Sequence, residues 1–458
     1  MASTSPTPGP SRRQSLRYWT QILRDPLAVY IALACDYGDA VRIPLTAKHT
    51  FFLLSRPEHA EHVLVAHQDH YVKAFTYRPL KAILGDGLLT AEGDTWRRHR
   101  RLVQPVFSHR HVQTFAPAVV AAARDRTNRW TPGATINLAD EMRTLTMHVI
   151  GRVLFGIDLA DDAEPIGRAV SRLQSAATAA MLLPNLGSPQ RTRWLAAHII
   201  PGLGRATTTL ESLVSRIIDA RIAAPHTEPS DLLDLLLATE ELLSRSEIQD
   251  EVMTLVLAGH ETTANTLTWA LALLSRHPAA RDRLVAEVDE VIGDGDPQAT
   301  DMESLVWTQA VVSETMRLYP PAWTIERDAV VADNIAGVEV SPGDTVAISP
   351  YLLHHHSEFW PNPEGFDPRR FMPDQHHPRY AFIPFGGGRR ICVGAGLAQL
   401  EATIALATLS QAVRLDLVPG TVVRPRADIT LHPRGPVTMT VAPPVRAAHA
   451  AAEPLTVG

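Results

Sequence analysis

The segment from Phe385 to Gly394, which reads FGGGRRICVG, constrains the fold of this chain more than any other segment. Its three consecutive glycines let the backbone bend and approach another group closely. Cys392 follows, and a helix is predicted to begin directly after Gly394, so the positive end of the helix dipole would stabilise a thiolate there. Arg390 lies just before the cysteine and can pair with an anionic group. The segment therefore predicts a tight loop that presents a soft sulfur ligand beside a cation.

A sulfur ligand beside a cation is what a haem site requires, because the iron takes an axial ligand and the propionates need positive charge. Two other interpretations compete with this one. A lone cysteine is commonly a buried structural residue, but the glycine run argues against that reading of Cys392. Gly394-Ala-Gly396 also resembles part of a dinucleotide-binding loop, although the residues before it form a loop containing Pro and Arg rather than a buried strand.

The rest of the chain is typical of one large helical domain with a minor β region. From Pro57 to about Leu318 the apolar residues recur with helical periodicity, and after that point short strand signals alternate with Pro, Gly and His. We expect a mainly α fold over residues 15–444, with a disordered leader at 1–14 and a flexible tail at 445–458. The first helix is expected over Ser15–Tyr37.

Composition and charge exclude several classes of protein. The net charge of −6 argues against nucleic-acid binding, which favours a basic surplus. Two cysteines cannot build a disulfide framework, and a reducing compartment is expected; Cys35 is predicted to lie in the core. No apolar stretch approaches the roughly 20 residues that span a bilayer, and the N-terminus has no apolar signal segment. We therefore expect a cytoplasmic protein without a membrane anchor.

Polar residues interrupt the long apolar helix predicted over Glu247–Arg276. Its middle reads Ala-Gly-His-Glu-Thr, so that Glu261 and Thr262 lie where an apolar helix would bury them. Burying such groups is costly unless they are paired or used. The alternative is a kinked core helix whose polar groups are satisfied locally.

Two further motifs place charged residues on single helix faces. Trp96 and Arg100 are four residues apart, and Glu314 and Arg317 are three apart, so each pair shares a face. Taken alone, such pairs are usually solvated. The histidine runs at 354–356 and 376–377 lack partner ligands nearby and are predicted to be loop residues rather than metal ligands.

Taken together, these motifs resemble the cytochrome P450 superfamily. Phe385, Gly388, Arg390, Cys392 and Gly394 match its F-x-x-G-x-R-x-C-x-G signature, and the other motifs follow in the family's order from about residue 30 to 442. The resemblance implies the P450 fold, a single large helical domain with small sheets. It also implies haem b (iron protoporphyrin IX) with the Cys392 thiolate as axial ligand.

The resemblance assigns expected roles to individual residues. Glu261 and Thr262 would deliver protons to bound oxygen. A structural network would pin the cysteine loop: Glu314, Arg317 and Arg370. The cofactor would be held by a further set: Trp96, Arg100, Arg327, Phe385, Arg390 and Cys392.

The implied activity is that of a monooxygenase, which uses O₂ and two electrons to hydroxylate a C–H bond. Because no flavin or nicotinamide domain follows residue 445, we expect a ferredoxin and a ferredoxin reductase as electron donors. They would dock on the basic side chains of Arg97, Arg98 and Arg101. Two alternatives are an H₂O₂-driven peroxygenase on the same fold and a non-catalytic haem-binding or sensor protein. The intact Glu261–Thr262 pair argues against both.

The expected substrate pocket is mostly apolar, which indicates a hydrophobic small molecule. The segment PPAWTIER resembles bacterial terpenoid hydroxylases, so a terpenoid of secondary metabolism is favoured, followed by a fatty acid or a macrolide or other polyketide. The residues expected to line the pocket are Phe75, Leu88, Leu89, Leu257, Ala258, Ala322, Trp323, Ile325, Ile429 and Thr430.

Overall fold

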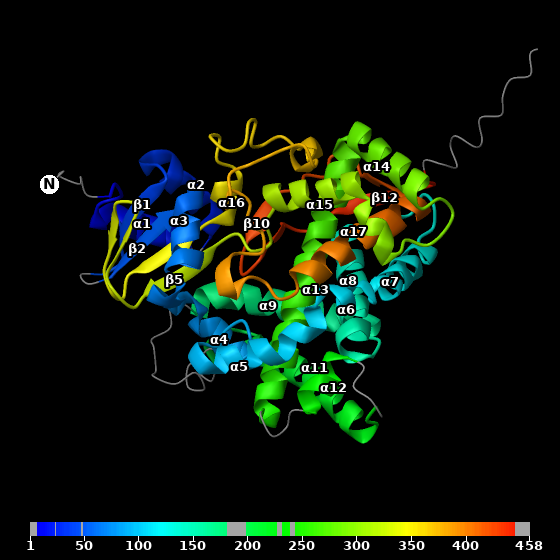
Figure 1. Ribbon diagram of the computed structural model, residues 1–458, viewed down its shortest axis with the longest axis horizontal. Helices are drawn as coiled ribbons and strands as arrows, with labels where there is room; N and C mark the ends of the chain where they lie inside the picture. Colours follow the sequence, from blue (N-terminus) through cyan, green and yellow to red (C-terminus); the bar gives the residue numbers. More distant parts are fainter. Residues whose placement is uncertain are drawn as a thin grey trace, which may run out of the picture.

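The computed structural model describes residues 7–22, 24–46, 49–180, 198–226, 231–238 and 243–444, and confirms a mainly α fold with small sheets (Figure 1). The α-helices are α1 (Arg12–Ile22), α2 (Pro26–Tyr37), α3 (Pro57–Glu61), α4 (Arg78–Leu84), α5 (Gly93–Val103), α6 (His109–Gln113), α7 (Ala116–Asn128), α8 (Leu138–Phe155), α9 (Ala163–Ala180), α11 (Leu203–Ala223), α12 (Leu232–Leu237), α13 (Arg245–Arg276), α14 (Pro278–Val291), α15 (Val306–Leu318), α16 (Pro350–His354) and α17 (Ala395–Ala412). The strands are β1 (Ala40–Pro44), β2 (Thr50–Leu54), β3 (Tyr71–Lys73), β4 (Thr135–Asn137), β5 (Ile325–Ala329), β6 (Asp333–Ile335), β7 (Val338–Val340), β8 (Thr345–Ile348), β9 (Arg414–Leu417), β10 (Pro425–Ala427), β11 (Leu431–Pro433) and β12 (Thr438–Ala442).

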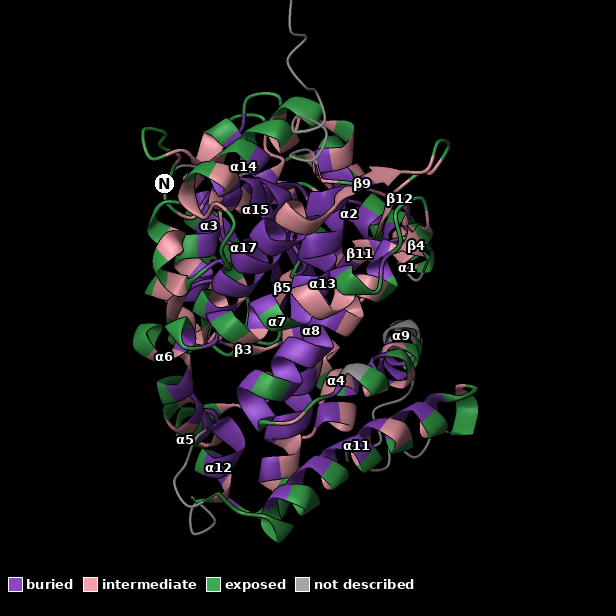
Figure 2. Ribbon diagram, turned by 90° about the vertical axis from the view of Figure 1, so that its right-hand side faces the viewer, coloured by how far each residue is buried: buried purple, intermediate pink, exposed green. Residues whose placement is uncertain are grey.

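Helix α13 runs through the middle of the molecule and is buried along most of its length (Figure 2). It begins with a capping box, in which the side chain of Ser244 accepts a hydrogen bond from the amide of Glu247 and the Glu247 carboxylate accepts one from the amide of Ser244. Helices α8, α15 and α17 pack against it. The predicted central helix is therefore confirmed, and it begins within two residues of the expected start.

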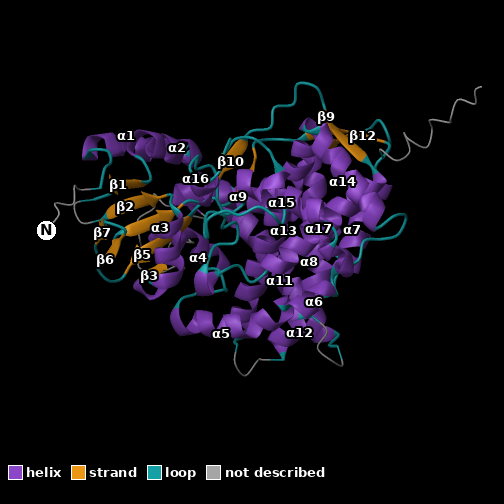
Figure 3. Ribbon diagram, turned by 45° about the horizontal axis from the view of Figure 1, so that its top comes forward, coloured by secondary structure: helices purple, strands orange, loops and turns teal. Residues whose placement is uncertain are grey.

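Most of the β region lies beside the helical part, next to the N-terminal helices, whereas β9 and β12 lie at the other side of the molecule, near α14 (Figure 3). Its main sheet has five strands in the order β1-β2-β8-β5-β3, and β2 and β8 run parallel. In β2, Phe51 and Leu53 pack with α2, whereas Phe52 and Leu54 belong to a second apolar cluster on the opposite face. Both faces are covered, which explains the uninterrupted apolar run of this strand.

The single helix expected over Ser15–Tyr37 is wrong. The structure has two helices there, because Pro26 cannot donate a backbone hydrogen bond to a preceding turn and Asp25 caps the second helix by accepting from the amide of Ala28. Helix α1 begins at Arg12, inside the stretch predicted as a leader. The predicted tail at 445–458 lies outside the described residues.

Cys35 is exposed near the end of α2, so its predicted place in the core is also wrong. The reason is that α2 buries the face containing Tyr30 and Leu33, which leaves Cys35 on the opposite side. Among the described helices, none combines the length and the apolar character needed to cross a bilayer.

Candidate active site

A cavity of about 410 Å³ lies between α13, the loop that carries Cys392, and residues of α4 and β5. It brings together residues that are far apart in the sequence but were predicted to act together. All of the residues expected to bind the cofactor or deliver protons line it: Trp96, Arg100, Glu261, Thr262, Arg327, Phe385, Arg390 and Cys392.

The loop before α17 presents Cys392 to this cavity. The amide of Cys392 donates to the carbonyl oxygen of Phe385 over 3.0 Å, which closes the loop on itself. Gly388 has a φ of +64°, and a Cβ there would lie 1.8 Å from the carbonyl oxygen of Leu64. Glycine at position 388 is therefore required by the packing of the loop against the π-helical segment His62–Ala66.

The Cys392 thiol is short of positive charge. Cys392 has solvent-accessible surface, but that surface faces the cavity and not the outside of the protein. Burial raises the pKa of the thiol, while the amide of Gly394 and the charge of Arg100 lower it. Arg100 is held nearby by donating to the carbonyl oxygen of Ile391 over 2.9 Å. A thiolate here needs a further cation, and a bound iron ion would supply it.

A cluster of cations forms another wall of the cavity. Burial lowers the pKa of Lys73 well below its usual value and that of Arg390 to about 10, and repulsion by Arg327 lowers both. Glu92 accepts from Arg390 over 2.6 Å, and the ring of Trp96 lies 4.3 Å from the Arg390 guanidinium. Three basic groups face one carboxylate in this cluster, so the cluster carries an excess of positive charge when they are protonated. A ligand with two carboxylates, such as haem, would neutralise that excess.

Two residues of the predicted substrate pocket do not line the cavity. The amide of Phe75 donates to Asp328 over 2.9 Å, which starts a helical turn that presents Tyr77 to the cavity instead. Trp323 packs against Tyr30, with ring centroids 5.1 Å apart, on the side of the main sheet covered by α2. The other predicted residues do line it: Leu88, Leu89, Leu257, Ala258, Ala322, Ile325, Ile429 and Thr430.

Helix α8 packs very closely against α13 at the cavity. A Cβ on Gly259 would lie 2.7 Å from Cδ1 of Ile150, so a larger residue there would require the end of the Ile150 side chain to shift. From α8, the hydroxyl of Thr146 donates to the carbonyl oxygen of His260 over 2.8 Å. The close approach explains why a helix-weakening residue occurs in the middle of a buried helix.

The acid and the hydroxyl of α13 lie at the same place. Glu261 is only 9% exposed, and its carboxylate accepts a hydrogen bond from the hydroxyl of Thr430 over 3.2 Å. The hydroxyl of Thr262 donates to the carbonyl oxygen of Ala258 over 2.8 Å. Both groups line the cavity although each also has a protein partner. The arrangement therefore offers a carboxyl and a hydroxyl to a ligand in the cavity.

The predicted network around Glu314 is present. Glu314 and Arg317 are both inaccessible to solvent and pair over 2.7 Å, and Arg370 approaches Glu314 over 3.4 Å. The guanidinium of Arg317 also donates to three loop carbonyl oxygens, those of His354, Pro363 and Gly365. The network therefore fastens the segment that leads to the cysteine loop.

His354 was predicted to be an ordinary loop residue, and this is wrong. It is fully buried, and burial lowers its pKa well below the usual value, so the ring is neutral. Its Nε2 accepts from the amide of Ile383 over 2.9 Å. The sequence does not distinguish the members of this histidine run. His354 is fully buried, whereas His356 pairs with Asp39 nearer the surface.

Glu401 is a further buried acid that sequence reasoning missed. It lies on α17, lines the cavity and is 1% exposed, with one carboxylate oxygen that has no partner among the described residues. Burial raises the pKa of Glu401 to about 8, although a hydrogen bond with Thr263 lowers it. The carboxyl therefore keeps its proton at neutral pH. The one available signal was that Glu401 is the only charged residue of α17.

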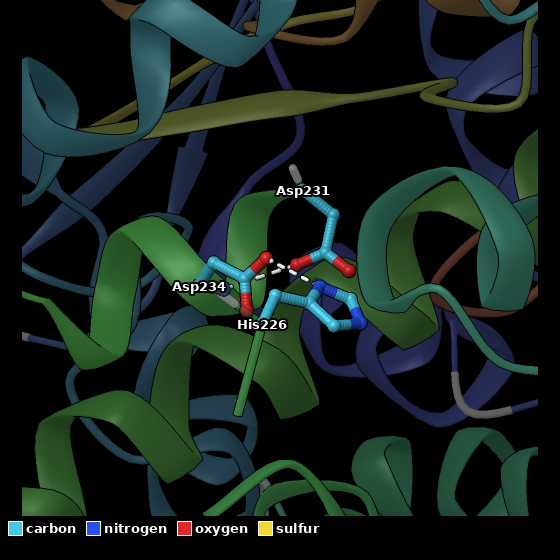
Figure 4. Close-up of side chains that lie close together, drawn as sticks. All are labelled: His226, Asp231 and Asp234. Atoms are coloured by element: carbon cyan, nitrogen blue, oxygen red, sulfur yellow. Dashed lines mark hydrogen bonds and ion pairs between the residues drawn. The ribbon is translucent and has the colours of Figure 1, made fainter. Parts of the chain in front are cut away.

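A second cluster of possible metal ligands lies away from this cavity. His226, Asp231 and Asp234 point toward one another (Figure 4), and Nδ1 of His226 lies 2.9 Å from Asp234. However, Arg221 pairs with both aspartates, and its distance to Asp231 is 2.7 Å. The arginine already supplies the positive charge that a metal would bring. We therefore interpret the cluster as a clamp between α11 and α12.

Comparisons with known proteins agree with the geometry of the cavity. The family model described as "Cytochrome P450" matches residues 7–439. The chain is 35% identical to cyclooctatin synthase from Streptomyces melanosporofaciens, covering 92% of each chain, and 32% identical to pentalenene oxygenase from Streptomyces avermitilis, covering 90% of this chain and 92% of the relative. A crystal structure of the cytochrome P450DA heme domain superposes with a TM-score of 0.83 at 25% identity, over 96% of this chain and 98% of that one.

The cation cluster leads to a prediction about haem retention. Arg390→Ala should yield purified protein depleted of haem, because the remaining cations would neutralise the propionates incompletely, at a cost of about 3–5 kcal/mol. The ratio of Soret to protein absorbance measures the occupancy. Arg389→Ala is the matched control, because Arg389 is exposed and pairs with Asp69 outside the cavity. Equal occupancy in the two variants would contradict the assignment.

The Glu401 carboxyl leads to a prediction about pH. The folded protein keeps a proton that the unfolded chain releases above its usual pKa of 4.5, so stability should fall between about pH 4.5 and pH 8. Glu401→Gln removes this dependence and should be the more stable protein above pH 8, by roughly 3–5 kcal/mol. Thermal unfolding of both proteins across this range measures the difference. The exposed Glu290 provides the control, and Glu290→Gln should give a constant difference from the parent.

Proposed function

Because the chain belongs to the cytochrome P450 family, we propose that it is a haem-thiolate monooxygenase for an uncharged terpenoid, with the Cys392 thiolate as the axial ligand. One observation carries the proposal. The Cys392 thiol, the acid–hydroxyl pair of Glu261 and Thr262, and an aliphatic wall line the same cavity. When bound, haem with a thiolate ligand supplies the activation of O₂ and the insertion of one oxygen atom into a C–H bond.

The chain's own residues would bind the cofactor and handle protons. Lys73, Arg327 and Arg390 would hold the two propionates. The Thr262 hydroxyl, now donating to Ala258, can turn to hold a water or to donate toward a ligand in the cavity. Glu261 beside it can pass protons inward. Apolar residues around these groups exclude bulk water, which protects the reaction from proton leakage.

The chemistry of the cavity lining favours a terpenoid. Its cations gather at the wall near Glu92 and at the cysteine loop, so none is left for the carboxylate of a fatty acid at the aliphatic end. The aliphatic wall comprises Leu80, Ile83, Leu84, Leu88, Leu89, Ile150, Leu154, Val170, Leu173 and Leu257. Two relatives bear the names cyclooctatin synthase and pentalenene oxygenase, which supports the same class.

The electrons would come from a ferredoxin and its reductase, since members of the cytochrome P450 family receive electrons from redox partners. Arg97 and Arg101 of α5 are exposed and offer a basic docking surface, although Arg97 also pairs with Asp94 and Arg98 pairs with Glu247. The two cysteines are both free, which agrees with a reducing, cytoplasmic setting.

A panel of compounds tests the substrate class. Pentalenene and other cyclic terpene hydrocarbons should shift the haem from low to high spin, because filling the aliphatic cavity displaces water from the iron. Dodecanoic acid and a macrolactone should give smaller shifts at equal concentration. Optical titration measures the shift. A full shift with dodecanoic acid and none with the terpenes would overturn the terpenoid assignment and leave the reaction class intact.

Thr262→Ala tests the reaction class. The variant should keep its reduced CO spectrum and its rate of electron uptake, but product per NADPH should fall and H₂O₂ should rise, because proton delivery fails. Product, peroxide and NADPH are measured together. Thr268→Ala is the matched control: Thr268 makes the same type of bond, to the carbonyl of Ala264, on the same helix but away from the cavity. Unchanged coupling in Thr262→Ala would remove this residue from the mechanism. A parent protein that forms product only when H₂O₂ is supplied, and none with NADPH and O₂, would identify a peroxygenase.

A further inference from the structure

The turn between β10 and β11 reaches the acid of α13 as well as the substrate. Ile429 and Thr430 at its tip both line the cavity, and Thr430 was predicted only as a pocket residue. The structure shows that the Thr430 hydroxyl donates to Glu261 over 3.2 Å. A side chain expected to contact substrate therefore contacts the proton-delivering acid.

A third residue orients that hydroxyl. The side-chain nitrogen Nδ2 of Asn265 donates to Oγ1 of Thr430 over 3.5 Å. Asn265 is 3% exposed and lies one helical turn after Glu261, on the same face of α13. An amide N–H can only donate, so the single hydroxyl proton of Thr430 is directed to the Glu261 carboxylate.

The turn is fixed at its base, so its tip has a defined position. The indole nitrogen of Trp323 donates to the carbonyl oxygen of Asp428 over 2.9 Å, and the amide of Leu431 donates to the carbonyl oxygen of Pro321 over 2.9 Å. The Asp428 carboxylate is held in turn by His432 at 3.1 Å. Trp323, which does not line the cavity, therefore contributes by holding the turn that does.

We propose that Thr430 is the positioning residue of the acid, and that its hydroxyl holds the Glu261 carboxyl in the orientation from which protons pass into the cavity. The proposal rests on the monooxygenase function proposed above. A turn that only shaped the substrate wall would need an apolar side chain at this position, as it has at Ile429. The hydroxyl, with Asn265 behind it, is explained by the acid that it contacts.

The test compares two ways of driving the same oxidation. Parent, Thr430→Val and Thr430→Ser are supplied with NADPH, a ferredoxin and its reductase, using pentalenene or whichever compound of the panel gives the largest spin shift. The same proteins are then driven with H₂O₂, which brings its own protons and electrons. Thr430→Val should lose about tenfold in product formed from O₂, with no loss in product formed from H₂O₂. Thr430→Ser, which keeps the hydroxyl, should restore the O₂-driven rate.

Other outcomes separate the possibilities. If Thr430→Val retains the parent's O₂-driven rate, or if both rates fall together and serine does not restore them, the positioning role is overturned and Thr430 is a wall residue. If the parent itself forms product only from H₂O₂, the monooxygenase function fails first, and the positioning role fails with it. The reduced CO spectrum of each variant shows that the haem site is intact, and Thr430→Ala provides a second variant should the valine disturb the turn.

Discussion

The buried ion pair between Glu314 and Arg317 is the interaction on which the position of the cysteine loop depends. A charge that loses its partner in the interior costs several kcal/mol, so both groups must be satisfied where they lie. Arg317 uses its remaining donors on carbonyl oxygens that are 37 to 48 residues away in the chain. The imidazole of His354 then accepts from the amide of Ile383, which precedes the cysteine loop directly. A long segment with little secondary structure is thus fixed by a helix that never touches the thiol.

The electrostatics of the cavity depend on what fills it. Desolvation lowers the pKa values of Lys73 and Arg390, which are half-buried, and raises the pKa of the Cys392 thiol. A negative charge would stabilise the charged forms of Lys73 and Arg390 at one wall of the cavity, and a positive charge would stabilise the Cys392 thiolate at the other. An iron porphyrin with two carboxylates supplies both at once. Binding of haem therefore contributes to the stability of the folded chain as well as to its chemistry.

The spacing of residues in the sequence was sufficient to predict those parts of the site that lie within a single helix or turn. The three-residue interval between Glu314 and Arg317 places both on one helix face, and the glycine run marks the tight turn before Cys392. Other residues depend on contacts between distant segments. Lys73 lies at the end of a short strand, and which way it faces is set by β5, more than 250 residues later. Trp323 lies among residues that line the cavity, yet the packing of α2 turns it to the opposite side of the sheet.

Most of the substrate wall comes from elements other than those that carry the chemistry. Glu261 and Thr262 lie on a buried helix, and the Cys392 loop is held by the ion-pair network, so these groups have little freedom. The aliphatic wall comes from α4, from the loop with Leu88 and Leu89, and from α8 and α9, with Leu257 added by α13, so most of it lies on elements that do not carry the reacting groups. The turn between β10 and β11 is the exception, because Ile429 contacts the cavity while its neighbour Thr430 holds the acid. A substrate that displaced this turn would therefore alter the supply of protons as well as the fit of the substrate in the cavity. Of all parts of the wall, this turn should have the largest effect on the amount of product formed per NADPH consumed.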